Sequence, residues 1–220
     1  SLMAFPEGTR SYTHKMKRFH KGAFYLAEQF KLDIIPVIIH GNSEILPKGN
    51  FVIKSGHLSV KILERIPFED KSYGNTDRER TKNISAHFKS KFKDFRNHAE
   101  NATYFHNMVL EEFRYKDYDL YQSVKTDLKT HQNTYKFILN TLDESERITH
   151  ISNADGQLDF LIALDGPSRN ITNFLENSVS RKLVQHSFIT NNHYKIHVVD
   201  TKQDAIKNLA NTIIINSDVL

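Results

Sequence analysis

Seven residues near the start of the chain decide its fold: Phe5-Pro6-Glu7-Gly8-Thr9-Arg10-Ser11. Gly8 can adopt a positive φ, which lets the backbone approach a ligand closely. Thr9 and Ser11 add hydroxyl groups, and Arg10 carries a planar guanidinium that holds phosphate through paired hydrogen bonds. Glu7 stands where it can orient Arg10 or bind a substrate hydroxyl. The stretch predicts a phosphate-binding turn, and a surface turn with an exposed ion pair is the alternative.

The residues after this block show an ordered pattern. A basic run occupies residues 14–21. Apolar residues then recur at three- and four-residue spacing, which predicts a helix over 19–30, and a buried strand is expected over 34–39 with Pro36 inside it. The F-P-E-G-T-R-S block, the K-x-G-A helix and the I-P-V strand together resemble the glycerolipid acyltransferases, specifically the 1-acylglycerol-3-phosphate acyltransferase family. The resemblance extends from Leu2 to about Pro67.

The resemblance implies an enzyme of phospholipid biosynthesis that needs no cofactor. It would transfer an acyl group from acyl-CoA or acyl-carrier protein to a lysophosphatidate-type acceptor. The residues that it assigns to the acceptor phosphate are Glu7, Gly8, Thr9, Arg10 and Ser11, and those that it assigns to the acyl side are Pro36 and Val37. Its expected partners are a lysophospholipid, an acyl thioester and a membrane surface, with peripheral attachment at the cytoplasmic face.

The family also carries an H-x-x-x-x-D pair, in which the histidine is the general base. The resemblance places this pair before the E-G-T-R block, where only four residues precede Phe5. We therefore expect the chain to be the C-terminal portion of an acyltransferase and to be inactive alone. His150 and Asp155 have the same spacing, but they follow the block, and we interpret them as a chance match.

Composition sets broader limits on the class of protein. The formal charge is +4 and the isoelectric point about 9.1, which suits anionic lipid headgroups but does not indicate nucleic-acid binding. Cysteine is absent, so disulfides and thiolate metal sites are excluded. The histidines show no metal-binding spacing, and no apolar run reaches the roughly 18 residues of a membrane-spanning helix.

The overall pattern predicts an α/β protein in three parts. Residues 1–100 are expected to be the C-terminal part of an acyltransferase domain, 101–145 a helical linker, and 146–220 a small Rossmann-like domain. In the last part, strands are expected at 148–152, 170–175, 194–199 and 212–216, with helices at 156–164, 178–186 and 202–209. Alternating short strands and helices predict a parallel sheet.

The third part resembles a degenerate class I methyltransferase. Residues 148–156 occupy the place of that family's first strand and glycine-rich loop, and Glu176 stands where an acidic residue would hold the ribose. Ser152 and Ala154 replace glycines, and Gly156 remains, so we expect no binding of S-adenosylmethionine. Two functions stay open besides acyl transfer: a non-catalytic binding or scaffolding module, and an S-adenosylmethionine-dependent methyltransferase.

Overall fold

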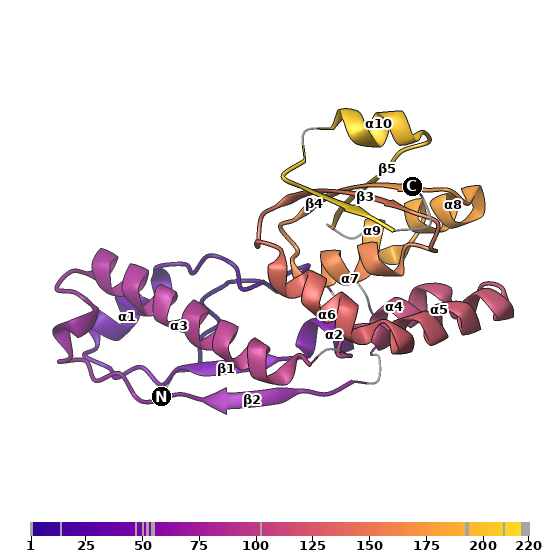
Figure 1. Ribbon diagram of the computed structural model, residues 1–220. Helices are drawn as coiled ribbons and strands as arrows, with labels where there is room; N and C mark the ends of the chain where they lie inside the picture. The colour runs from indigo at the N-terminus through magenta and orange to yellow at the C-terminus, as the bar shows by residue number, and fades with distance from the viewer. Residues whose placement is uncertain are drawn as a thin grey trace. The chain divides into compact units, whose positions relative to one another are not determined.

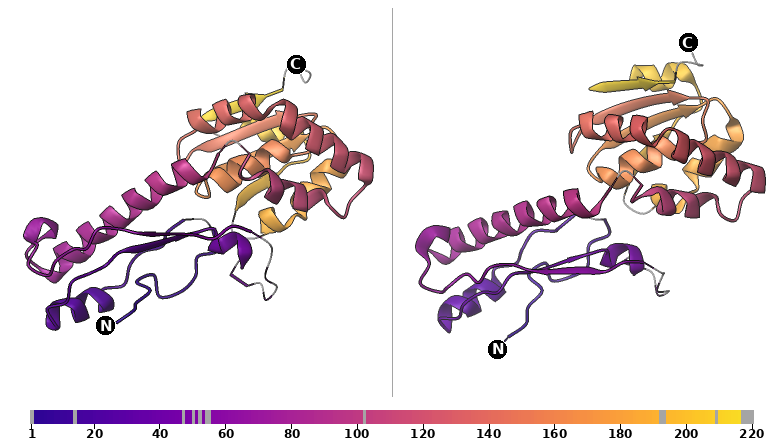
Figure 2. Two further views of the ribbon diagram at one scale, coloured as in Figure 1. Left: turned by 90° about the horizontal axis from the view of Figure 1, so that it is seen from below. Right: turned by 60° about the horizontal axis from the view of Figure 1, so that its bottom comes forward.

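The computed structural model describes residues 2–216 except 14, 47, 50, 52, 54, 55, 102, 192, 193 and 209. The chain divides into two compact units, Ser1–Ala99 and Glu100–Leu220. The elements of the first unit are α1 (Gly22–Gln29), β1 (Val37–His40), α2 (Asn42–Ile45), β2 (Ser59–Ile62), the 3-10 helix η1 (Lys71–Tyr73) and α3 (Asp77–Ala99). Figure 2 shows α3 as the longest helix, running beside the ribbon formed by β1 and β2.

The first unit contains a two-stranded antiparallel sheet in which Val37 lies opposite Ile62. Pro36 precedes β1 and has no N–H to donate, but its carbonyl accepts a hydrogen bond from the N–H of Leu63 at 2.9 Å. The alternation of side chains at residues 58–63 predicts a strand in a hairpin with residues 51–54. That strand is present as β2, and its partner is β1. A second predicted strand, at 51–54, includes positions 52 and 54, which lie outside the described residues.

A small apolar core holds α1 and α3 together. Its buried members are Phe19, Phe24, Ile66, Ile84 and Phe88. The ring of Phe19 stacks on that of Phe24 and meets that of Phe88 edge to face, with centroid separations of 6.0 and 5.2 Å. Since Phe24 lies on α1 and Phe88 on α3, these aromatic contacts fix the two helices side by side.

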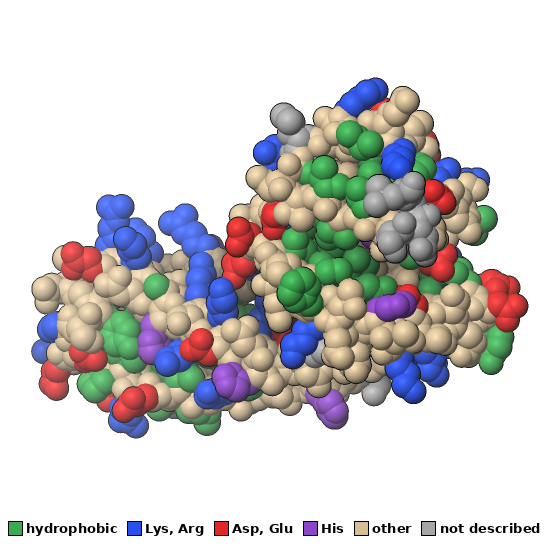
Figure 3. Space-filling view, in the orientation of Figure 1, with side chains coloured by type: hydrophobic (Ala, Val, Ile, Leu, Met, Phe, Trp, Pro, Cys, Tyr) green, Lys and Arg blue, Asp and Glu red, His purple; other side chains and the backbone are tan. Residues whose placement is uncertain are grey.

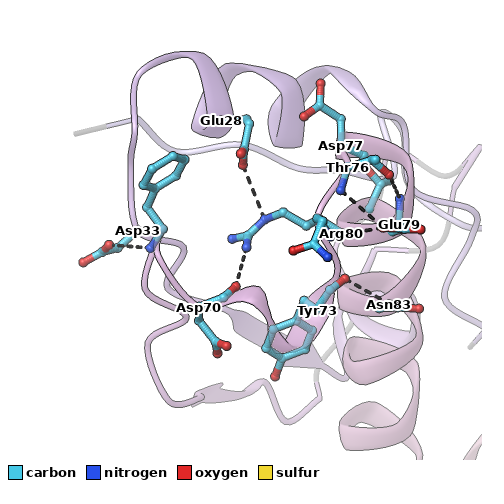
Figure 4. Close-up of polar contacts among 12 residues, drawn as sticks. Glu28, Asp33, Asp70, Tyr73, Thr76, Asp77, Glu79, Arg80 and Asn83 are labelled. Atoms are coloured by element: carbon cyan, nitrogen blue, oxygen red, sulfur yellow. Dashed lines mark hydrogen bonds and ion pairs between the residues drawn. The ribbon is translucent and has the colours of Figure 1, made fainter.

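A buried arginine on α3 completes this packing (Figure 4). Nε of Arg80 lies 3.4 Å from a carboxylate oxygen of Glu28 on α1, and Nη1 donates to the backbone carbonyl of Asp70. The Arg80 side chain is almost fully buried, whereas Glu28 retains some solvent contact. Arg80 therefore joins α1, the residue before η1, and α3 through one guanidinium.

We predict that Arg80→Gln lowers the free energy of unfolding of the first unit by about 1.5–3 kcal/mol, because charge-assisted hydrogen bonds contribute that much. The matched control is Arg78→Gln, which removes an exposed charge two positions earlier on α3. Urea denaturation followed by amide exchange in α1 measures both variants. Equal stability of the two variants would contradict the assigned role of Arg80.

The second unit surrounds a parallel sheet with strand order β5-β4-β3-β6. Its strands are β3 (Arg147–Ser152), β4 (Asn170–Leu175), β5 (Lys195–Val198) and β6 (Thr212–Ile215). Its helices are α4 (His106–Phe113), α5 (Tyr118–Thr130), α6 (Gln132–Thr141), α7 (Gln157–Asp165), α8 (Ser178–Gln185), α9 (Phe188–Asn191) and α10 (Lys202–Lys207). Figure 1 shows α10 on one face of the sheet and α7 on the other. The predicted α/β class and parallel sheet are confirmed, and the Rossmann-like assignment stays a prediction.

The segment expected as a linker is helical and packs with the sheet. Val124, Leu128 and Tyr135 are buried on α5 and α6, in the same core as Phe160 of α7 and Ile171 of β4. An apolar stripe at helical spacing needs a neighbouring surface to cover it, and this unit provides that surface. The second unit thus begins at Glu100 and contains these helices.

Arg169 connects the helices of the second unit to the sheet. Its buried guanidinium donates to the backbone carbonyls of Asp143 and Leu142, each at 2.9 Å, and lies 2.7 Å from a carboxylate oxygen of Asp165. The carbonyls belong to the loop after α6, and Asp165 ends α7. One side chain therefore satisfies polar groups from two helices just before β4 begins.

We predict that the second unit loses stability as pH falls below about 6.5. Burial lowers the pKa of His106 from its usual 6.5, and Nε2 has no hydrogen-bond partner among the described residues. Since the unfolded chain binds a proton more readily than the folded unit, stability is complete above pH 6.5 and decreases as pH falls toward the lowered pKa. Amide exchange in β3 and β4 across this range measures the effect.

His106→Gln should remove this part of the pH dependence. His197→Gln changes an exposed histidine of the same unit and serves as the control. An unchanged pH profile in His106→Gln would show that other groups cause the acid sensitivity.

Candidate functional site

The first unit contains a cavity of about 700 Å³. Its wall includes the five motif residues Glu7, Gly8, Thr9, Arg10 and Ser11. Apolar side chains form much of the remaining wall, among them Met16, Phe19, Phe24, Ile38, Phe88 and Phe92. The cavity therefore combines a polar loop with an apolar interior, as a ligand with a charged head and an apolar body requires.

The motif begins with a tight turn at Gly8. Its φ is +68°, and its N–H donates to the carbonyl of Phe5 at 3.0 Å. A Cβ at this position would lie 3.0 Å from the ring of His20. A residue other than glycine would also have to adopt a backbone conformation that L-residues rarely occupy. The turn thus requires glycine for both reasons.

Glu7 fixes the loop that follows this turn. Its Oε2 accepts a hydrogen bond from the N–H of Lys17 at 2.7 Å, and the N–H of His20 donates to the carbonyl of Pro6 at 2.7 Å. These two bonds close the loop at its base. The partner that the structure gives Glu7 is therefore a backbone N–H, where sequence reasoning expected Arg10 or a substrate hydroxyl.

Arg10 lies in the wall of the cavity with its guanidinium exposed. Nη1 donates to the carbonyl of Leu46, the residue that ends α2, at 3.1 Å. A guanidinium has five N–H donors, so this bond leaves most of them for an anion. Oγ of Ser11 accepts from the N–H of Thr13 at 3.3 Å, which bends the chain after Arg10.

The strand residues predicted for the acyl side differ in position. Val37 lines the cavity and is partly exposed. Pro36 is buried and does not belong to the described lining. The assignment of these two residues to an acyl chain stays a prediction.

Sequence reasoning missed polar residues in the same wall, notably His40 and Asp33. His40 is buried at the end of β1 against the rings of Phe92 and Phe95. A carboxylate oxygen of Asp33 accepts from the N–H of Phe68 at 2.9 Å. Asp33 directly precedes the apolar run 34–39, and that placement is the sequence signal by which it could have been found.

The H-x-x-x-x-D pair of the second unit is not brought together. Nδ1 of His150 lies 2.9 Å from Oδ1 of Asp159, and both side chains are buried. Oδ2 of Asp159 accepts from Nδ2 of Asn173 at 3.0 Å. Asp155 instead accepts from the hydroxyl of Ser180 at 2.6 Å. His150 and Asp155 therefore have different partners, in accordance with a chance match of spacing.

The first strand of the second unit ends in a loop that carries side chains. The buried Ser152 hydroxyl oxygen accepts from the N–H of Ala154 at 3.0 Å and from Asn216 at 2.9 Å. Gly156 has a φ of +91°, and a Cβ there would lie 2.3 Å from Val184. Glu176 is exposed after β4. The absence of cofactor binding at this loop stays a prediction, and among the described residues no group of three or more acidic or histidine side chains is arranged to hold a metal.

Comparison with known proteins gives similarity over the first part of the chain. Residues 1–40 match the family model described as acyltransferase. A 1-acyl-sn-glycerol-3-phosphate acyltransferase of Saccharomyces cerevisiae is 43% identical over 72 residues, which are 32% of this chain and 24% of the relative. The enzyme of the same name from Limnanthes douglasii is 40% identical over 70 residues, 32% and 25% of the two chains. The alpha form from Homo sapiens is 35% identical over 68 residues, 31% and 24%.

These alignments span about a quarter of the length of the curated relatives and about a third of this chain. No solved structure is significantly similar to the chain. The family model covers the F-P-E-G-T-R-S block, the helix after it and the strand that directly follows Pro36. Residues 1–40 are therefore similar to the acyltransferase family, as the order of these motifs predicted.

Proposed function

We propose that the first unit binds a lysophosphatidate-type acceptor during acyl transfer from a thioester, either acyl-CoA or acyl-carrier protein. The observation that carries the proposal is the cavity in which all five motif residues share a wall with a largely apolar interior. The acceptor phosphate would bind at Arg10, Thr9 and Ser11, and the apolar part of the lipid would extend past Phe88 and Phe92. The names of the relatives from Saccharomyces cerevisiae and Limnanthes douglasii, both 1-acyl-sn-glycerol-3-phosphate acyltransferases, support this substrate class.

Acyl transfer requires the acceptor hydroxyl to attack the thioester carbonyl. A general base takes the hydroxyl proton, the new ester bond forms as the C–S bond breaks, and the thiolate leaves. In this proposal, Arg10 and the loop around Gly8 hold the phosphate so that the hydroxyl faces the thioester. Such positioning contributes several kcal/mol to barrier lowering. The resemblance assigns the role of this base to the histidine of the family's H-x-x-x-x-D pair.

The same proposal places the reaction at the cytoplasmic face of a membrane, with the protein attached peripherally. A lysophospholipid acceptor partitions into bilayers, so the site must reach a lipid surface. The exposed cations of the first unit suit anionic headgroups there. The role of the second unit is not part of this proposal.

We predict that Arg10→Ala weakens lysophosphatidate binding by about ten- to a hundredfold, because a charge-assisted hydrogen bond contributes about 1.5–3 kcal/mol. Arg10→Lys should restore little, since an ammonium lacks the planar fork that fixes the phosphate. Isothermal titration against lysophosphatidate and its dephosphorylated analogue measures the effect. Only the phosphorylated ligand should respond to the substitution.

The control for this experiment is Arg78→Ala, which removes an exposed arginine of the same unit. It should leave both dissociation constants unchanged. If Arg10→Ala fails to alter the preference for the phosphorylated ligand, Arg10 is not the phosphate ligand and the proposed site is wrong.

Two substitutions of Glu7 provide a second test of the proposed site, because we predict that one retains lysophosphatidate binding and the other weakens it. An N–H donor needs only an acceptor, so Glu7→Gln keeps an oxygen for Lys17 and should bind lysophosphatidate within about threefold of the parent. Glu7→Leu has no acceptor and leaves the loop open at its base. It should weaken binding about tenfold, as expected when a partly buried donor loses its partner.

The same titration measures both Glu7 variants, with thermal unfolding as a check on the fold. Equal loss in Glu7→Gln and Glu7→Leu would mean that the charge of Glu7 matters, which would favour the role beside Arg10 expected from sequence. Retained binding in both would show that the loop does not need this bond.

A further inference from the structure

The outer side of α1 is apolar and exposed. Tyr25 and Leu26 of α1 are exposed, as is Phe30, which directly follows the helix, and the exposed Gln29 is the polar residue among them. The opposite side of α1 carries Ala23, Phe24 and Ala27, which line the cavity. The short helix α1 therefore carries apolar residues both on its cavity side and on its solvent side. A surface helix of a soluble unit ordinarily has polar residues on its solvent side, so the exposed apolar residues of α1 need an explanation.

Cations surround this apolar surface. Arg18, Lys21 and Lys31 are exposed just before and just after α1. Within residues 18–33 the two acidic residues have cationic partners, since Glu28 pairs with Arg80 and Asp33 with Arg65. The surface around α1 is therefore apolar at its centre and positively charged at both ends. Figure 3 shows Lys and Arg side chains projecting from the part of the molecule formed by α1 and α3.

We infer that the outer side of α1 binds an anionic lipid surface, with Tyr25, Leu26 and Phe30 inserted among the headgroups. The charge pattern selects this occupant, because Arg18, Lys21 and Lys31 complement anionic lipids. Amphipathic helices at interfaces combine apolar insertion with cations beside it in the same way. No helix in the described part of the chain is long and apolar enough to cross a bilayer.

Contact at α1 also orients the cavity. Ala23 and Ala27 line the cavity from the same helix that would lie in the interface. The role of this contact in orienting the cavity rests on the proposed function. The contact itself is tested by vesicle binding, which depends neither on acyl transfer nor on binding at the phosphate site.

Co-sedimentation of the full chain with vesicles tests the inference, with phosphatidylcholine alone compared with a mixture of phosphatidylcholine and phosphatidylglycerol. Binding should be stronger to the mixture and should weaken with salt. Phe30→Ser should weaken it about tenfold, or about 1.4 kcal/mol. Phe137→Ser is a matched control, since Phe137 of the second unit is 69% exposed and Phe30 is 68% exposed. Leu26→Ser is the second variant, in case Phe30→Ser unfolds.

The charges have a separate test. Lys21→Gln combined with Lys31→Asn should weaken binding to the anionic vesicles about fivefold per lysine removed and leave binding to phosphatidylcholine unchanged. Asn tolerates the left-handed backbone of Lys31, whose φ is 50°. Lys129→Gln with Lys136→Gln is the control in the second unit. Equal effects of the α1 variants and their controls, or no vesicle binding by the parent chain, would overturn the inference. Arg10→Ala should bind vesicles normally, so failure of the phosphate site and failure of the lipid surface are distinguishable.

Discussion

The ion pair between Arg80 and Glu28 is the contact on which the first unit most depends. A two-stranded sheet is marginal in water without a helix packed against it, and the apolar core here is small. The guanidinium of Arg80 holds α1 against α3, and α1 supplies one wall of the cavity. The shape of the site is therefore coupled to a buried charge on α3.

In the second unit, clusters of buried polar groups also hold helices in place. Arg169 donates to a carbonyl at the end of α6, and Asp159 of α7 pairs with Nδ1 of His150 and accepts from Nδ2 of Asn173. Burying these groups would cost several kcal/mol if they were unpaired, so their partners are part of what fixes the helices on the sheet. His150 has the spacing of a catalytic histidine and the surroundings of a structural one.

Sequence reasoning predicted what depends on local pattern. The bounds of β4 follow from alternation, because every second residue of Asn170–Leu175 is buried and successive side chains of a strand point to opposite faces of the sheet. The pairing of β2 with β1 depends on contacts distant along the chain, and no local signal specifies it. The motif predicted five residues that share one cavity wall. It did not predict the bond from Lys17 to Glu7, since a backbone N–H has no side-chain signature.

Lys31, just after α1, has a strained backbone conformation that glycine would relieve. It is the one non-glycine residue with positive φ in the described part of the chain, and that conformation costs an L-residue about 1 kcal/mol. Glycine at this position would end α1 with less strain and a more stable fold. The same change would delete a cation beside the apolar surface of α1. At this position, higher thermal stability and higher affinity for anionic lipids therefore require different residues. Selection for thermal stability alone would favour glycine and yield a more stable protein that binds membranes more weakly.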